Sequence, residues 1–66
     1  MKIELNGQPR ELPAGTTLSS LLDGEGLAER RVAIEVNGEI VPRSQHAGHA
    51  LGEGDRVEIV HALGGG

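Results

Sequence analysis

The sequence predicts an α+β fold in which a mixed sheet of four to five strands packs on one main helix. Two Asn-Gly pairs, Asn6-Gly7 and Asn37-Gly38, each lie between short runs of alternating apolar and polar residues, which predicts two β-hairpins. The stretch between them spaces its leucines as one face of a helix does. A last alternating run near the C-terminus supplies one more strand.

The first hairpin is predicted in KIELNGQPREL, residues 2–12. Ile3 and Leu5 alternate with polar neighbours, and Asn-Gly favours a tight type I′ turn because both of its central residues need a positive φ. Pro9 has no backbone N–H to donate, so the returning strand must lie at the edge of the sheet or begin at this residue.

The helix is predicted in PAGTTLSSLLDGEGL, residues 13–27. Thr16 or Thr17 can cap its N-terminus, and Leu18, Leu21 and Leu22 then fall at i, i+3 and i+4 on one face. Glycines at positions 24 and 26 end it after about two to three turns. A helix this short is not stable alone, so it must pack on the sheet.

The second hairpin is predicted in RRVAIEVNGEIVPR, residues 30–43, with apolar residues 32, 34 and 36 on one face and a return through residues 39–41 that Pro42 ends. SQHAGHA follows as a loop with room for a helical turn, and GEGD as a tight turn. RVEIVHAL, residues 56–63, is the last strand, with Val57, Ile59 and His61 on one side and Glu58, Val60 and Ala62 on the other.

This order of elements is that of a β-grasp roll similar to ubiquitin. The helix between the second and third strands makes a long crossover, which allows the first and last strands to pair in parallel. We expect one domain over residues 1–63, followed by a flexible glycine tail at 64–66.

Composition excludes several functions for a chain of 66 residues. It has no Phe, Trp or Tyr and a net charge of −4, so it lacks the stacking platforms and the clustered cations that bind nucleic acid. Cysteine is absent, which excludes thiol nucleophiles and Cys-ligated zinc. So small a core cannot also wall a deep substrate pocket, and we find no nucleophile–base pair. We therefore expect no enzyme activity.

The N-terminal segment has neither the apolar core nor the cleavage site of a signal peptide, and no stretch is long enough to span a membrane. A cytoplasmic protein that binds no membrane is expected. His46, His49 and His61 suggest a metal site, but a third ligand and supporting residues would have to converge. Solvent-exposed loop histidines explain His46 and His49 better, so we expect no metal.

Three glycines, Gly64, Gly65 and Gly66, follow the last strand directly. Without side chains, such a segment can enter a narrow channel, and its one functional group is the α-carboxylate of Gly66. A carboxylate is a poor electrophile, and nothing in this chain activates it. ATP bound to a partner enzyme can do so through an acyl-adenylate, which a sulfur nucleophile then converts to a thiocarboxylate.

The segments VNGEIVPR (Val36–Arg43) and GDRVEIV (Gly54–Val60) and the terminal glycines together resemble the ThiS family of sulfur carriers in thiamine biosynthesis. The resemblance covers nearly the whole chain and places the last strand at the centre of the sheet. It implies that Gly66 is adenylated by a ubiquitin-activating-like enzyme that uses ATP and becomes a thiocarboxylate, with Gly65 as its paired glycine. The family ends in two glycines, so Gly64 need not be functional.

The resemblance also implies the partners. They are the adenylating enzyme, a sulfur donor such as a cysteine desulfurase, and thiazole synthase, which receives the sulfur. The carrier itself is expected to bind no cofactor and to be a monomer when alone. Val60 and Ala62 lie beside the tail on the predicted open face, and together with Leu63 they are candidates for docking on the adenylating enzyme. The β-propensity of a central strand explains these residues equally well.

Two alternatives stay open from the sequence. The same chemistry serves carriers in molybdopterin, tRNA-thiolation and cysteine pathways, although molybdopterin carriers are usually longer. A β-grasp interaction module that never carries sulfur is the alternative from another class, and it predicts an inert tail.

Overall fold

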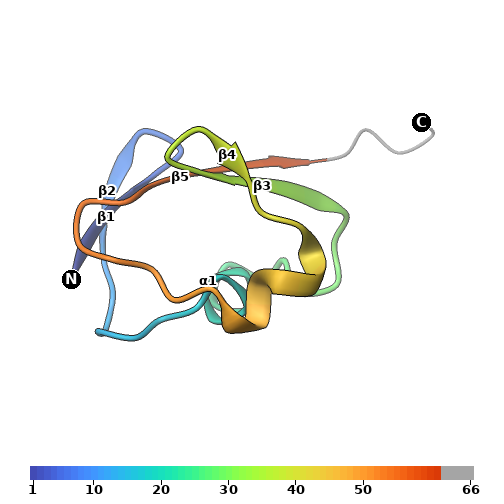
Figure 1. The fold of residues 1–66 in the computed structure, drawn as a ribbon, viewed down its shortest axis with the longest axis horizontal. Coiled ribbons are helices and arrows are strands. Elements are labelled where there is room, and N and C mark those ends of the chain that lie inside the picture. Colours follow the sequence, from blue (N-terminus) through green and yellow to red (C-terminus); the bar gives the residue numbers. More distant parts are fainter. Residues whose placement is uncertain (62–66) are drawn as a thin grey trace.

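The computed structural model describes residues 1–61, and it confirms the predicted α+β class (Figure 1). The elements in chain order are β1 (Lys2–Leu5), β2 (Gln8–Glu11), α1 (Leu18–Gly24), β3 (Val32–Val36), β4 (Glu39–Ile40), the 3₁₀ helix η1 (Arg43–Gly48) and β5 (Arg56–His61). The strands form one sheet, and α1 and η1 lie on the same face of it (Figure 1).

The last strand lies at the centre of the sheet. The strand order is β2-β1-β5-β3-β4, so β5 pairs with β1 in parallel and with β3 antiparallel. The β3 ladder is the longer one and runs from Val36 opposite Val57 to Val32 opposite His61. β2 lies at one edge, as Pro9 requires, since its missing N–H leaves the outer side unpaired.

Both Asn-Gly turns have the backbone that the sequence predicts. The φ angles are 49° at Asn6 and 82° at Gly7, and 53° at Asn37 and 88° at Gly38. Positive φ at both central residues is the mark of a type I′ turn, whose twist matches that of the strands that it joins. The hairpin pairs are Leu5 with Gln8 and Val36 with Glu39.

The asparagines of these turns also bind the central strand, and no local sequence pattern predicts this contact. The side-chain Oδ1 of Asn6 accepts a hydrogen bond from the Ile59 N–H at 2.8 Å, and Oδ1 of Asn37 accepts one from the Arg56 N–H at 2.9 Å. Backbone bonds accompany them, from Asn6 N to the Val57 carbonyl at 2.9 Å and from Asn37 N to the Arg56 carbonyl at 2.8 Å. The two turns are therefore hydrogen-bonded to β5 on opposite sides of the strand.

The helix begins and ends where its sequence signals lie. Thr17 is the N-cap, and its Oγ1 accepts from the Ser20 N–H at 3.1 Å, which satisfies one of the free amides of the first turn. After Gly24 the chain leaves the helix through Gly26, which has a φ of 74°.

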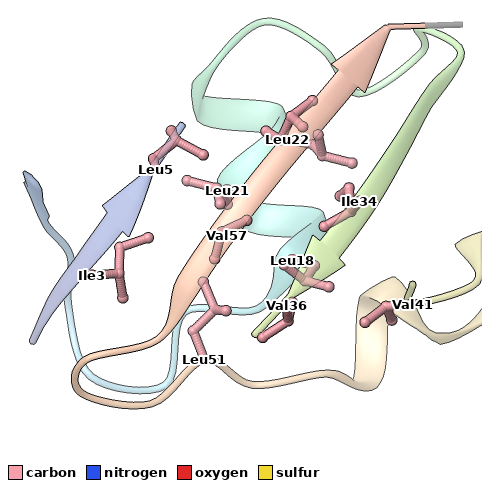
Figure 2. Packing of buried hydrophobic residues seen from close by; sticks show 11 residues of the cluster. Ile3, Leu5, Leu18, Leu21, Leu22, Ile34, Val36, Val41, Leu51 and Val57 are labelled. Carbon is pink, nitrogen blue, oxygen red and sulfur yellow. The ribbon is translucent and has the colours of Figure 1, made fainter. Parts of the chain in front are cut away.

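The core between helix and sheet is aliphatic (Figure 2). Leu18, Ile34 and Val57 have the lowest exposure, and they come from α1, β3 and β5. The other buried apolar residues are Ile3, Leu5, Leu21, Leu22, Val36, Val41, Leu51 and Ile59. Val41 and Leu51 lie outside the strands and close the end of the core near η1 (Figure 2).

Two boundaries differ slightly from the predictions. β4 ends at Ile40, although the Val41 N–H still donates to the Ile34 carbonyl at 2.9 Å. The segment predicted as a loop with room for a helical turn forms the six-residue η1. Within residues 1–61, no helix is long and apolar enough to cross a membrane.

Replacing Asn6 tests the bond that joins the first turn to β5. We expect Asn6→Gly to keep the turn, because glycine adopts positive φ, and to lower the free energy of unfolding by about 1 kcal/mol, since the partly buried Ile59 N–H loses its acceptor. Asn6→Asp retains an acceptor oxygen and should stay closer to the parent. Urea unfolding of the three proteins measures the difference; equal midpoints for Asn6→Gly and the parent would contradict this role.

Candidate functional site

The predicted site lies at the C-terminal end of β5. The roles assigned to Gly64, Gly65 and Gly66, and to Ala62 and Leu63, fall outside the described residues and stay predictions. The structure describes what leads up to them, namely the strand from Arg56 to His61 and its surroundings.

The start of β5 is fixed by a tight turn with its own hydrogen bonds. Asp55 accepts the Gly52 N–H at 2.8 Å through Oδ2 and the side-chain amide of Asn37 at 3.1 Å through Oδ1. Its carbonyl accepts the Glu4 N–H at 2.9 Å. Asp55 thus joins β1, the second Asn-Gly turn and its own loop, and this fixes the base of the strand that leads to the tail.

Val60 lies on the sheet face that points away from the helix, as the alternation predicted. Its neighbours in the strand, Ile59 and Val57, are buried, whereas Val60 is 56% exposed. Ala33 of β3 lies directly opposite it. Ile40 is 61% exposed and is a second large apolar residue on this open face, because it pairs with Glu35, which lies opposite Glu58. The sequence pattern alone does not single out Ile40.

The open face is charged at the other end of β5. The Arg56 guanidinium lies 3.6 Å from the Glu4 carboxylate, and both side chains are at least half exposed, so this pair contributes little to stability. Glu35 and Glu58 are directly opposite each other, where like charges repel. The exposed apolar surface is therefore concentrated at the tail end of β5 and at β4.

The prediction of a solvent-exposed histidine at position 46 is wrong. His46 is 4% exposed, and its Nε2 lies 2.9 Å from the Val41 carbonyl oxygen. The 3₁₀ turn of η1 carries the side chain inward, where it bonds a carbonyl at the rim of the core. His49 is half-buried and His61 is exposed, so the three histidines do not share one environment.

Metal ligands do not converge in the described part of the chain. No group of three or more His, Cys, Asp or Glu side chains in residues 1–61 is placed to hold a metal ion. His46 instead has a structural role, as a hydrogen-bond partner for the backbone at the end of the second hairpin.

The fold and the position of the last strand define the class. A mixed sheet with one main helix, and with its C-terminal strand between the first strand and the third, is a ubiquitin-like β-grasp domain. The family model of ThiS matches residues 3–66, and the chain therefore belongs to the ThiS family.

The proteins that this chain resembles in sequence fall into two lengths, one about equal to its own and one much longer. The chain is 48% identical over 66 residues to a thiazole synthase of Magnetococcus marinus and 46% identical to one of Paramagnetospirillum magneticum, and it spans 20% of the length of each. It is 33% identical to the sulfur carrier protein ThiS of Escherichia coli (strain K12), where the match covers all of both chains.

A solved structure agrees with the fold over its whole length. The crystal structure of the thiamine biosynthesis protein ThiS from Geobacter metallireducens superposes with a TM-score of 0.86 at 29% identity, and the match covers 100% of both chains.

Zinc tests the structural role of the histidines. We expect the melting temperature to be the same with added Zn²⁺ and with EDTA, because no set of metal ligands converges among residues 1–61. If zinc did bind, at about 100 times its Kd and only to the folded state, it would stabilise the protein by about 2.7 kcal/mol and raise the melting temperature. Differential scanning calorimetry measures this. A rise with zinc that His49→Ala removes would instead establish a metal site.

Proposed function

We propose that this protein is a sulfur carrier of thiamine biosynthesis and that the α-carboxylate of Gly66 carries the sulfur. The observation that supports it most is the match to a sulfur carrier protein over the full length of both chains. The proposal requires the protein in the cell to end at Gly66, so that this carboxylate is free.

The chemistry runs in two steps on partner enzymes. The Gly66 carboxylate attacks the α-phosphorus of ATP, and pyrophosphate leaves, which gives an acyl-adenylate. A sulfide nucleophile then attacks the acyl carbon, and AMP leaves with the bonding electron pair. The product is a thiocarboxylate, whose sulfur is a far better nucleophile than the original carboxylate oxygen.

The described structure supports this division of labour. β5 is hydrogen-bonded to neighbours on both sides near its base and presents its end to a partner from a fixed position. The chain contains no cysteine, so no side-chain thiol or persulfide can carry the sulfur, which agrees with an acyl group as its carrier. The adenylation and the later use of the sulfur belong to other proteins, and the carrier itself acts as a substrate rather than as an enzyme.

Thiazole synthase is the proposed acceptor of the sulfur. Two relatives named thiazole synthase contain a segment similar to the whole of this chain. A segment that shares a chain with the synthase is held at high effective concentration beside it, which suits a group that must pass directly from one to the other.

Intact mass spectrometry tests the proposal directly. After incubation with the adenylating enzyme, ATP and sulfide, we expect a mass increase equal to the difference between one sulfur and one oxygen atom. Iodoacetamide should then alkylate this protein although it has no cysteine, and fragmentation should place the label on Gly66.

A shortened chain is the matched control. Deleting Gly65 and Gly66 should abolish the mass increase and leave the fold unchanged, since neither residue belongs to a described element. An unchanged mass in the full chain, with an enzyme that modifies another carrier in parallel, would refute the carrier role. The mass of the protein isolated from its own cells shows whether it ends at Gly66.

Val60→Asp tests the open face as the surface that binds the adenylating enzyme. We expect a loss of at least about tenfold in affinity, because a carboxylate would be buried without a partner in an apolar interface. Ser44→Asp is the control, since Ser44 is also exposed but lies in η1, on the helix side of the sheet. Titration calorimetry with both variants measures the effect, and equal affinities would exclude a special role for Val60.

A further inference from the structure

The central strand β5 is longer than its neighbour β1, and this leaves backbone groups open on one side. Successive residues of a strand direct their N–H and C=O groups to opposite sides. Arg56 bonds Asn37 on the β3 side, whereas the Val57 carbonyl accepts from Asn6 on the β1 side. The groups of Ile59 and His61 therefore also face the β1 side.

The β1 ladder ends before it reaches these groups. The last paired residues are Leu5 and Val57, after which the chain turns away into β2. The Oδ1 of Asn6 takes the next place and accepts the Ile59 N–H at 2.8 Å. Among residues 1–61, no backbone group is paired with the Ile59 carbonyl or with the His61 N–H on this side. β5 runs on past the end of β1 (Figure 2).

A hollow of about 330 Å³ lies beside these open groups. It is bounded by the ends of β1 and α1, and its lining includes Asn6, Arg10, Glu25, Ile59 and His61. The Arg10 guanidinium binds the Glu25 carboxylate at 2.8 Å and 3.3 Å and so forms a polar wall. The lining reaches from Leu5, the last residue of β1, to His61, the last residue of β5, so the hollow lies between the ends of these two strands.

We propose that an extended segment of thiazole synthase adds to β5 here as a short extra strand in line with β1. In a parallel ladder, one residue of that segment donates its N–H to the Ile59 carbonyl and accepts the His61 N–H with its own carbonyl. Its side chain enters the hollow, where the Arg10–Glu25 pair favours a polar group. This inference rests on the proposed function, because it names the synthase as the acceptor.

Thiazole synthase is favoured as the occupant by position and by the relatives. The open groups lie on the last described residues of the strand that leads to Gly66, so a strand added there aligns the enzyme backbone with the path to the reactive end. Relatives that carry a segment like this one within a thiazole synthase keep the two together. The other possible occupant is a second copy of this chain.

A pair of variants at His61 separates the backbone from the side chain. His61→Pro removes the N–H, and the ring occupies the place of the added strand, whereas His61→Ala keeps the N–H and removes only the imidazole. Because the N–H of His61 does not face β3, the β3 ladder should tolerate proline. We expect His61→Pro to bind separately produced thiazole synthase about tenfold more weakly or worse, and His61→Ala to bind as the parent does.

Amide hydrogen exchange of the unmodified protein gives a second readout that does not depend on the folding of any variant. The His61 amide should exchange fast in the free protein and slowly in the complex with thiazole synthase. The Ile59 amide is the internal control, since Asn6 protects it in both states.

Three results would overturn the inference. The first is that both variants bind thiazole synthase equally well and the His61 amide stays unprotected in the complex. The second is that the His61 amide is already protected from exchange in the free protein at low concentration. The third is that its protection rises with the concentration of this chain alone. The last would assign the edge to a second copy. Formation of the thiocarboxylate, measured in parallel, distinguishes these outcomes from a failure of the carrier function itself.

Discussion

The hydrogen bonding of β5 on both sides is the constraint on which the rest of this structure depends. The bond between Asn6 and Ile59 joins residues 53 positions apart, and the β1 and β3 ladders enclose the strand between them. Such non-local pairing must offset the entropy of closing most of the chain into one loop. The sheet is therefore complete only when β5 is in place. The proposed reactive end follows this central strand, on which the pairing of both halves of the sheet depends.

The small aliphatic core explains why polar contacts matter so much here. A domain of this size buries only about 60% of the surface that its unfolded chain exposes, and this one has no aromatic side chain to add area. Asn6, Asn37 and Asp55 supply hydrogen bonds at the places where the backbone ladders beside β5 stop. The imidazole of His46 does the same for the Val41 carbonyl.

Local signals predicted most of the fold, and contacts between distant segments account for what they missed. Asn-Gly pairs, the Thr17 cap and the leucine spacing act within a few residues, so the sequence alone locates the hairpins and the helix. The central place of β5 came from a family resemblance, because no local pattern specifies it. The burial of His46 depends on where the Val41 carbonyl lies after folding. The alternation of apolar and polar residues along β5 was enough to predict that Val60 is exposed, because the face to which a side chain points depends only on its position in the strand.

An open strand edge is a liability in any protein, because it is a template for pairing with other chains. Among residues 1–61 the exposure is short, since Asn6 occupies the position next to β1 and leaves the Ile59 carbonyl and the backbone groups of His61 beyond it. These few groups, with one polar hollow beside them, can set the register of a strand from a partner held there by other contacts. A carrier must leave one enzyme before it meets the next, and an edge of this length favours contacts that form and break readily.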